Sequence, residues 1–385
     1  MIKIENPANC CGCTACANIC NRKAINMTED KEGFLYPVAD CDLCNNCGLC
    51  EKVCPITKRK NKKESNKYKE LYAVRHKDED VLLNSSSGGA FSALADWFIQ
   101  NDGVVYGAVY NEKMQVVHSR ATTTNEYSEM RGSKYSQSDL QGTFLKCKED
   151  LKEGKLVLFT GTPCQIAGLK SFLMRPYENL ITVDLVCHAV PSPRVFADYV
   201  DSVNKKFKDT LKSINMRYKK SCGWSHSFSF CYSFCSGKEM VDPIGFSNWG
   251  RYFFSGCIDR PSCHQCLFTN FDREGDFTIA DFWDDLMLRP DIKSSKGTSL
   301  FMINTEKGSM LFPKIKSLRS WKISEYESLQ RCLIKPSDAS PRREEFWNCY
   351  LENGYEETMR KFFPVRLRQI ISQKIKKTLK KILGK

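Results

Sequence analysis

Four closely spaced cysteines near the start of the chain constrain its fold most strongly. Residues 44–55 read CNNCGLCEKVCP, which matches the ligand spacing C-x2-C-x2-C-x3-C-P of iron–sulfur proteins. Residues 10–20 repeat the cysteine spacing, with Asn21 where the proline would stand. Two such runs predict two [4Fe-4S] clusters, and the loops that hold them would depend on the metal for their fold.

Proteins with two such runs exchange ligands between them, because the fourth cysteine of each run binds the cluster of the other run. The expected sets are Cys10, Cys13, Cys16 and Cys54 for one cluster and Cys44, Cys47, Cys50 and Cys20 for the other. Both sets are complete, so Cys11 and Cys41 are expected to be ordinary thiols. Residues 1–57 would then form a small domain like a two-cluster bacterial ferredoxin.

Disulfides and zinc explain the 21 cysteines of this 385-residue chain less well than iron does. The N-terminus does not resemble a secretion signal and no apolar run is long enough to span a bilayer, so we place the protein in the cytoplasm, where disulfides rarely persist. Zinc modules usually separate two C-x2-C pairs by a dozen or more residues, whereas here four thiols lie within residues 44–54. A zinc-rich protein that binds nucleic acid is therefore disfavoured.

The net charge of +13 is concentrated at the C-terminus. Residues 361–385 contain nine Lys and Arg and no acid, and from Arg366 onward the apolar residues recur at helical spacing. Such a basic amphipathic helix can lie on the inner face of an anionic membrane, or it can dock on its own protein or a partner. Residues 58–70 are also highly charged, but Tyr68 alone represents the interleaved aromatic residues that stack on bases, which favours a solvated linker over a nucleic-acid contact.

From Leu71 onward, short apolar runs alternate with helical patterns. Strands are expected at residues 71–74, 103–109, 156–160, 181–186 and 276–283, helices within 84–100, 166–173 and 195–206, and a β-hairpin in the aromatic, cysteine-rich stretch 218–235. This alternation predicts a mixed α+β and α/β protein with a mixed sheet, divided into residues 71–180 and 181–330. Residues 331–385 would form a C-terminal extension.

Candidate site residues follow the predicted strands. The serines and glycines of residues 85–89 open a helix, where backbone N–H groups can hold a phosphate or where a simple N-cap with a glycine turn suffices. Cys164 follows a strand at a helix start, Cys187 ends the next strand, and Cys263 and Cys266 form a C-x2-C pair. Together these four thiols are enough for one further cluster.

Six short motifs occur in a fixed order along residues 71–330. They are Ser86-Ser87-Gly88-Gly89-Ala90, Gly132-Ser133-Lys134-Tyr135, Gly161-Thr162-Pro163-Cys164-Gln165, Cys187-His188, Cys263 to Cys266, and Asp281-Phe282-Trp283. In this order they resemble the beta subunits of coenzyme F-420-reducing hydrogenases and dehydrogenases, together with the related chlorophyll-cycle reductases. Each motif is short, and it is their joint occurrence that makes the resemblance specific.

The resemblance implies a bound FAD and a [4Fe-4S] cluster on Cys164, Cys187, Cys263 and Cys266. The residues implied around the flavin and its phosphates are Ser86, Ser87, Gly88, Gly89, Lys134, Tyr135, Gly161 and Thr162. Asp281 would bind a flavin or substrate hydroxyl, or cap the turn that follows it. Lys134 and His188 are the candidate catalytic residues, and His188 could instead orient the cluster loop.

These features predict a flavin-dependent iron–sulfur oxidoreductase. Clusters pass single electrons, whereas a flavin can collect two for an organic substrate. Electrons from a soluble partner protein would enter the N-terminal clusters, reach the third cluster, and reduce FAD and then a small-molecule substrate, or they would run in reverse. The alternative is a non-catalytic electron-transfer protein that feeds a partner enzyme. Either protein could form a homo-oligomer, and nothing in the sequence identifies a deazaflavin pocket.

Overall fold

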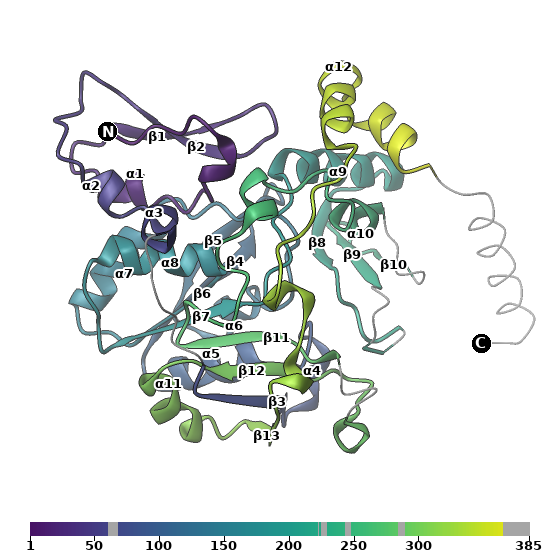
Figure 1. The fold of residues 1–385 in the computed structure, drawn as a ribbon. Helices are drawn as coiled ribbons and strands as arrows, with labels where there is room; N and C mark the ends of the chain where they lie inside the picture. The colour runs from purple at the N-terminus through teal and green to yellow at the C-terminus, as the bar shows by residue number, and fades with distance from the viewer. Residues whose placement is uncertain (61–67, 222, 225–228, 243–247, 284–288, 365–385) are drawn as a thin grey trace, which may run out of the picture.

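The structure is a computed structural model that describes residues 1–60, 68–221, 223–224, 229–242, 248–283 and 289–364. A small N-terminal module lies against a larger body built on one sheet (Figure 1). Among the helices described, none has the length and apolar character needed to cross a membrane.

The N-terminal module, defined here as residues 1–60, consists of two loop–helix segments and a hairpin. Its elements are the 3-10 helix Pro7–Asn9, α1 (Ala15–Ile19), β1 (Ile25–Glu29), β2 (Leu35–Ala39), α2 (Leu49–Lys52) and α3 (Pro55–Lys60). Both α1 and α2 begin after a residue with positive φ, Thr14 and Gly48, and each helix carries the third cysteine of its run. The two cysteine runs thus adopt matching local structures.

The body is organised around an eight-stranded mixed sheet. In spatial order its strands are β13 (Leu318–Lys322), β3 (Glu70–His76), β12 (Ser299–Ile303), β11 (Phe277–Asp281), β7 (Leu180–Leu185), β6 (Val157–Gly161), β4 (Val104–Tyr110) and β5 (Val116–Ala121). The strands β11, β7, β6 and β4 are parallel, and the flanking strands pair antiparallel. The mixed sheet and the five strands predicted from the sequence are confirmed, with ends shifted by a few residues. Because β6 and β7 are neighbours, the sheet runs across the expected division at residue 180.

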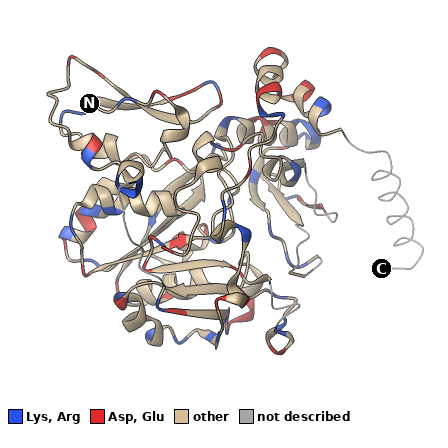
Figure 2. Ribbon diagram, in the orientation of Figure 1, with Lys and Arg blue, Asp and Glu red and all other residues tan. Residues whose placement is uncertain are grey.

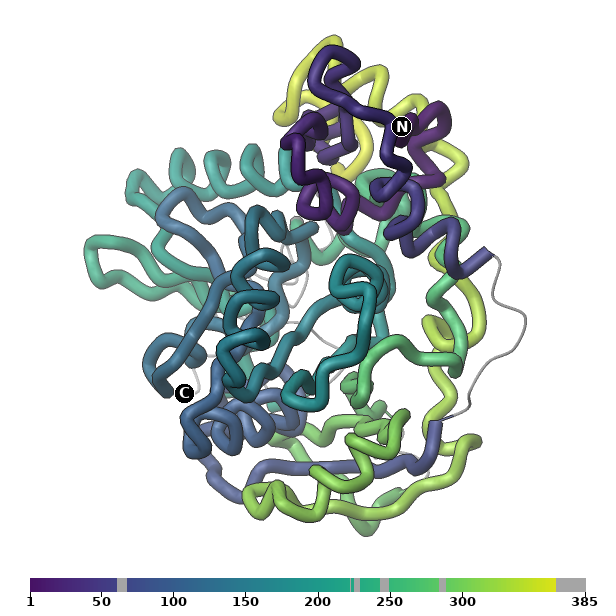
Figure 3. Tube along the Cα trace, turned by 90° about the vertical axis from the view of Figure 1, so that its left-hand side faces the viewer, coloured from purple at the N-terminus to yellow at the C-terminus, as the bar shows by residue number. Residues whose placement is uncertain are grey.

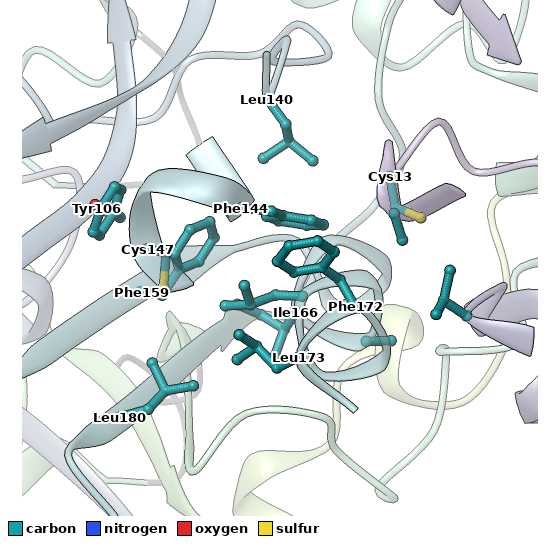
Figure 4. Packing of buried hydrophobic residues seen from close by; sticks show 14 of the residues in the cluster. Cys13, Tyr106, Leu140, Phe144, Cys147, Phe159, Ile166, Phe172, Leu173 and Leu180 are labelled. Carbon is teal, nitrogen blue, oxygen red and sulfur yellow. The ribbon is translucent and has the colours of Figure 1, made fainter. Parts of the chain in front are cut away.

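Helices cover both faces of this sheet. On one face lie α5 (Ala90–Gln100), α6 (Thr124–Ser128) and α11 (Glu306–Leu311), with α4 (Glu79–Leu83) nearby. On the other face lie α7 (Thr143–Lys152) and α8 (Pro163–Leu173), whose buried residues also contact the N-terminal module. In Figure 4, Cys13 of the module lies beside the aromatic core of α7 and α8. Helix α8 is therefore the layer between the sheet and the module.

The close contact between α8 and the module depends on one glycine. A Cβ added at Gly168 would lie 2.7 Å from Cys13 Cβ and 2.9 Å from its Sγ. These separations are shorter than real side chains tolerate, so any larger residue at this position must displace either the helix or Cys13. Gly168 therefore allows the first cysteine run to dock on the body.

A second, three-stranded sheet packs beside the first. It contains β8 (Leu211–Asn215), β9 (Phe230–Phe234) and β10 (Glu239–Asp242), and is covered by α9 (Pro193–Phe207), α10 (Asn248–Phe253) and α12 (Arg343–Phe362). The prediction of a hairpin within residues 218–235 is wrong, because among the described residues of that stretch only β9 is a strand, and it pairs with β8 and β10. Aromatic composition favours strands, but Gly223, with φ of 72°, belongs to a loop.

Remaining connections use short helices: 3-10 turns at Pro261–Gln265, Pro290–Ile292, Phe312–Lys314, Tyr326–Ser328 and Arg331–Leu333. The module and α12 lie at the same end of the molecule in two perpendicular views (Figures 1 and 3). They are joined by Arg343 at the start of α12, which donates to Glu32 and, at 3.0 Å, to the Asp259 carbonyl oxygen. This ion pair ties the two ends of the described chain together.

The expected solvated linker at residues 58–70 is wrong at both ends. Helix α3 continues to Lys60, and β3 already begins at Glu70. Arg59 is buried, and its guanidinium donates to Asp272 at 2.5 Å, Glu274 at 3.0 Å and Asn270 at 2.9 Å. Its partners lie far away in the sequence, so a count of local charges could not reveal that it is buried.

Charge over the described surface is mixed. Basic and acidic side chains both occur on α7 and on α12 (Figure 2). The basic amphipathic helix predicted for residues 366–385 lies outside the described residues.

Candidate functional site: three adjoining cavities

The first cysteine set surrounds a small cavity in the N-terminal module. Cys10, Cys13, Cys16 and Cys54 all line a cavity of about 20 Å³. Cys54 belongs to the second run but lies with the first three thiols of the other run, which is the crossing expected from the spacing. Burial raises the pKa of the Cys16 thiol to about 12. These protonated thiols would be deprotonated on binding a metal.

The second cysteine set lies toward the outside of the module. Backbone N–H groups donate to its sulfur atoms: Ile2 to Cys50 at 3.4 Å, Ala24 to Cys20 at 3.3 Å and Asn46 to Cys44 at 3.4 Å. Cys47 is exposed, and Cys44 is half-buried. Amide donors of this kind stabilise negative charge on sulfur. Cys41 is also exposed, as an ordinary thiol would be.

The four scattered thiols of the body meet in a second cavity. Cys164, Cys187, Cys263 and Cys266 line a cavity of about 140 Å³. Cys164 starts α8 directly after β6, Cys187 follows β7, and the other two belong to the turn after Pro261. The carboxyl ends of the parallel strands β6 and β7 therefore bring Cys164 and Cys187 together, as such sheets commonly do at their sites, and the turn supplies the other two thiols.

The chemistry of this second cavity fits a metal cluster. Burial raises the pKa of the Cys187 thiol well above its ordinary value, and the neighbouring thiols Cys263, Cys164 and Cys266 raise it further. Four partly buried thiols that hold one another protonated need a cation to become thiolates. In the described residues, no three His, Cys, Asp or Glu side chains converge on a single-ion position. A [4Fe-4S] cluster makes a different demand, because each thiolate binds a separate iron.

The third cavity, of about 430 Å³, contains the residues implied around a flavin. Those that line it are Ser86, Ser87, Gly89, Lys134, Tyr135, Gly161, Thr162, His188 and Asp281. Gly88 does not line it: its N–H donates to Ser299 Oγ at 2.8 Å, and a Cβ there would lie 2.3 Å from the Val74 carbonyl oxygen. Gly88 therefore permits close packing of the loop on β3 and β12.

The serine-rich loop presents the start of α5 to this cavity. Gly89 is the N-cap with φ of 80°, and no side chain caps the first turn of the helix. Ser86 Oγ accepts hydrogen bonds from the N–H and the hydroxyl of Ser133, at 2.8 and 3.1 Å. Lys219, which is buried, donates to the Ser87 carbonyl oxygen at 2.5 Å. The loop is thus held by its neighbours, while the helix N-terminus has no cap of its own.

Lys134 holds its own loop in place. Its ammonium donates to the carbonyl oxygens of Glu129 at 2.7 Å, Arg131 at 2.9 Å and Gly132 at 3.3 Å. Burial lowers the pKa of Lys134 to about 7. These three carbonyl contacts indicate a role in shaping the cavity wall, and a catalytic role for Lys134 stays a prediction.

Arg217 is a cavity residue that sequence reasoning missed. It is buried and lies 3.2 Å from Asp281 Oδ2, with its guanidinium 4.9 Å from the centre of the Trp283 ring. Trp283 in turn stacks on Trp224 at 4.9 Å. Asp281 is therefore an ion-pair partner in the cavity wall. No spacing pattern in the sequence marks Arg217.

His188 lies between the second and third cavities. Its Nε2 is 3.2 Å from Ser337 Oγ, its Nδ1 is 3.7 Å from Cys332 Sγ, and its ring packs on Phe253 at 5.1 Å. Burial lowers the pKa of His188. Both proposed roles, proton donor and orienting residue, are compatible with this position.

The three cavities adjoin in a row. Cys187, His188, Ala189, Val190 and Cys332 line both the second and the third cavity. Asn9, Cys11 and Ile56 line both the first and the second. Cys11, expected to be an ordinary thiol, is buried in the wall between the first two cavities and interacts with Cys13 and Cys164. Sequence spacing offered no reason to single out Cys332.

Comparison with known proteins places the chain among redox proteins. It is 20% identical over 299 residues to the F subunit of the F(420)H(2) dehydrogenase of Methanosarcina mazei, covering 74% of this chain and 80% of the relative. It is 23% identical over 340 residues to the coenzyme F420-dependent sulfite reductase of Methanocaldococcus jannaschii. This match covers 86% of this chain and 50% of the length of that relative. An uncharacterized ferredoxin of Methanocaldococcus jannaschii is 31% identical over 72 residues, which are 17% of this chain and 92% of the ferredoxin.

Among solved structures, a chain of the F420-reducing [NiFe] hydrogenase complex from Methanosarcina barkeri is similar at 18% identity and a TM-score of 0.46, covering 77% of this chain and 92% of that chain. Residues 154–328 match the family model that describes the C terminus of the beta subunit in coenzyme F420 hydrogenase/dehydrogenase. The matched residues include all four thiols of the second cavity. Residues 154–328 of this chain therefore form the C-terminal domain that characterises the coenzyme F420 hydrogenase/dehydrogenase beta subunits.

Proposed function

We propose that this protein is a flavin-dependent iron–sulfur oxidoreductase of the cytoplasm. Electrons from a ferredoxin-type donor pass through [4Fe-4S] clusters to FAD and on to a small organic acceptor, or in the reverse direction. The similarity to a dehydrogenase subunit, a sulfite reductase and a ferredoxin supports a redox role. The alternative, a non-catalytic electron-transfer protein, would use the same clusters without the flavin chemistry.

The row of adjoining cavities is the observation that carries this proposal. Two cavities lined by predicted cluster cysteines share walls, and the second shares a wall with the cavity lined by predicted flavin residues. Electron transfer between redox groups requires them to be close, and the shared walls supply that closeness. The exposed Cys47 and half-buried Cys44 of the outer set would face a partner protein.

The residues divide naturally among the cofactors. The outer cluster would be held by Cys20, Cys44, Cys47 and Cys50, the inner cluster of the module by Cys10, Cys13, Cys16 and Cys54, and the third cluster by Cys164, Cys187, Cys263 and Cys266. FAD would occupy the cavity of about 430 Å³, where the uncapped start of α5 offers N–H groups to its phosphates. Bound flavin would exchange single electrons with a cluster and two with an organic molecule.

Metal and flavin analysis of anaerobically purified protein tests the proposal. The protein should contain about twelve iron atoms per chain, as three cubane clusters require, together with FAD released on denaturation. Full iron occupancy without any flavin would favour the non-catalytic electron-transfer protein. A colourless protein that contains zinc would contradict both hypotheses.

A further inference from the structure

Arg260 is a buried cation between the N-terminal module and the body. It is 0% exposed and is one of the largest fully buried side chains of the protein. It lines the second cavity, just before the turn that carries Cys263 and Cys266. Within the described residues, no carboxylate forms an ion pair with Arg260, although other buried arginines such as Arg59 and Arg273 have one.

The hydrogen-bond acceptors of Arg260 are uncharged carbonyl and amide oxygens, apart from one cysteine sulfur. Its Nε donates to the Cys10 carbonyl oxygen at 2.8 Å, and its Nη groups donate to Gln137 Oε1 and the Leu35 carbonyl oxygen, each at 2.9 Å. The guanidinium lies 4.3 Å from the centre of the Tyr36 ring and 5.3 Å from that of Phe34. Its remaining contact, at 3.7 Å, is with Cys10 Sγ. The geometry therefore aims a fixed cation at a cysteine expected to bind a cluster.

The neighbouring carboxylate does not neutralise Arg260. Asp259 is buried with no hydrogen-bond partner for either carboxylate oxygen among the described residues, and burial raises the pKa of Asp259 to about 7. The cation that acts on Asp259 is Arg343. The groups of opposite potential charge around Arg260 include Cys10, Tyr36, Cys11, Cys263 and Cys164, and four of these five are thiols. Since a buried charge needs a counter-charge, the missing anion must come from the thiols or from what they bind.

The chain makes room for this arginine at the first cysteine run. A Cβ at Gly12, whose φ is 69°, would lie 2.7 Å from Arg260 Nη1. Only glycine fits this backbone conformation and this close approach without strain. The guanidinium thus lies against the backbone of the first cysteine run, at the glycine two residues after Cys10.

We propose that Arg260 is the buried counter-ion of the two inner clusters, by which we mean the inner cluster of the module and the third cluster. It is a positioning residue that raises the reduction potentials of these clusters and fixes the N-terminal module on the body. This inference rests on the proposed function, because it assumes clusters at both thiol sets. A cluster becomes more negative when it accepts an electron, so a fixed cation in a low-dielectric interior stabilises its reduced form. The outer cluster, on the far side of the module, would not feel this charge to the same extent. Electrons would then be drawn from the outer cluster inward.

Redox titrations followed by electron paramagnetic resonance test this role. In R260Q, the ratio of reduced to oxidised iron–sulfur centre at a fixed potential should fall about tenfold for the inner clusters. For a one-electron couple, this fall corresponds to a decrease of about 59 mV in the reduction potential. The outer cluster should be unchanged, and R260K, which keeps the charge, should restore most of the lost ratio. R194Q is the matched control, because Arg194 binds the module through Glu29 and the Lys31 carbonyl oxygen, away from the thiols.

The outcomes separate this inference from the proposed function. Wild-type protein without iron–sulfur signals would overturn the proposed function before any variant is compared. R260Q with full iron and unchanged potentials would overturn the inference and leave the proposed function standing. If R260Q does not assemble its clusters, R260K decides between the outcomes. A ratio of reduced to oxidised centre in R260K that stays within threefold of the wild-type ratio supports a charge effect. Loss of iron from R260K as well would show that the shape of Arg260 matters and not its charge, which overturns the proposed counter-ion role.

Discussion

At the scale of single residues, the four thiols of the second cavity carry the assignment of a third cluster. All four line one cavity although they come from three separate segments. The double variant C164S/C187S should lower the iron content from about twelve toward about eight atoms per chain, because it removes two ligands of one cubane cluster. The measurement is iron quantification on anaerobically purified protein.

The matched control for this prediction is C41S/C235S. Both cysteines are exposed and belong to none of the three predicted ligand sets. The control should retain the full iron content. Unchanged iron in C164S/C187S would refute the ligand set.

Buried His118 makes stability depend on pH. It lies in the wall of the third cavity, where its Nε2 is 2.9 Å from the Thr160 carbonyl oxygen and its Nδ1 is 2.9 Å from Ser138 Oγ. Burial lowers the pKa of His118 from 6.5 to about 4. Between these values the unfolded chain binds the proton and the folded chain does not, so the stabilisation is complete above pH 6.5 and is lost as the pH falls toward 4.

From about pH 7.5 to about pH 5.5, His118 should therefore lower the free energy of unfolding by about 1.4 kcal/mol. Urea unfolding of the wild type and of H118Q at both pH values measures this contribution. The decline with falling pH should be smaller in H118Q by roughly this amount. Equal declines in the two proteins would show that His118 does not titrate in this way.

At the scale of elements, helix α8 couples the N-terminal module to the sheet. A Cβ at Gly168 would meet Cys13, whereas one at Gly142, near the start of α7, would meet nothing within 4 Å. Overpacking at the first position should cost about 1–3 kcal/mol of stability. G168A should therefore lower the free energy of unfolding and weaken retention of iron, while G142A serves as the control. The idea fails if the two variants behave alike in urea unfolding and iron content.

The elements also show how far sequence reasoning reaches. Strands β4, β6 and β7 were predictable because buried parallel strands are continuous apolar runs bounded by turn residues. The cysteine crossing within the module was predictable because ligand spacing reflects cluster geometry. Each of these signals is local and repeats along the chain.

The remaining features depend on contacts between distant segments. Arg59 was assigned to a solvated linker, yet it pairs with Asp272 more than two hundred residues away, a separation of 213. Arg217, Arg260 and Cys332 are single residues without a spacing pattern, so only the folded chain shows that they line the cavities. The hairpin predicted within residues 218–235 failed for the related reason that composition does not fix which strands pair.

At the scale of the whole molecule, the N-terminal module joins the body through several ion pairs and through apolar contacts with α7 and α8. The module consists of short helices and one hairpin, and its own apolar core is small. Iron removal by a chelator should therefore unfold residues 1–60 while the central sheet persists. Hydrogen exchange should show lost protection in the module and retained protection in β6 and β7. Equal protection of the module with and without iron would mean that its packing on α8 suffices.

The three cavities would form one electron path that ends at a flavin. Stopped-flow measurement of the reduction of bound FAD by a reduced bacterial-type ferredoxin tests this path most directly. The wild type is compared with a C164S/C187S variant that still contains flavin and the two N-terminal clusters. We predict that the variant's flavin is reduced at least about tenfold more slowly, because the cluster beside the flavin cavity is missing. Flavin reduction at the wild-type rate in that variant would contradict the path.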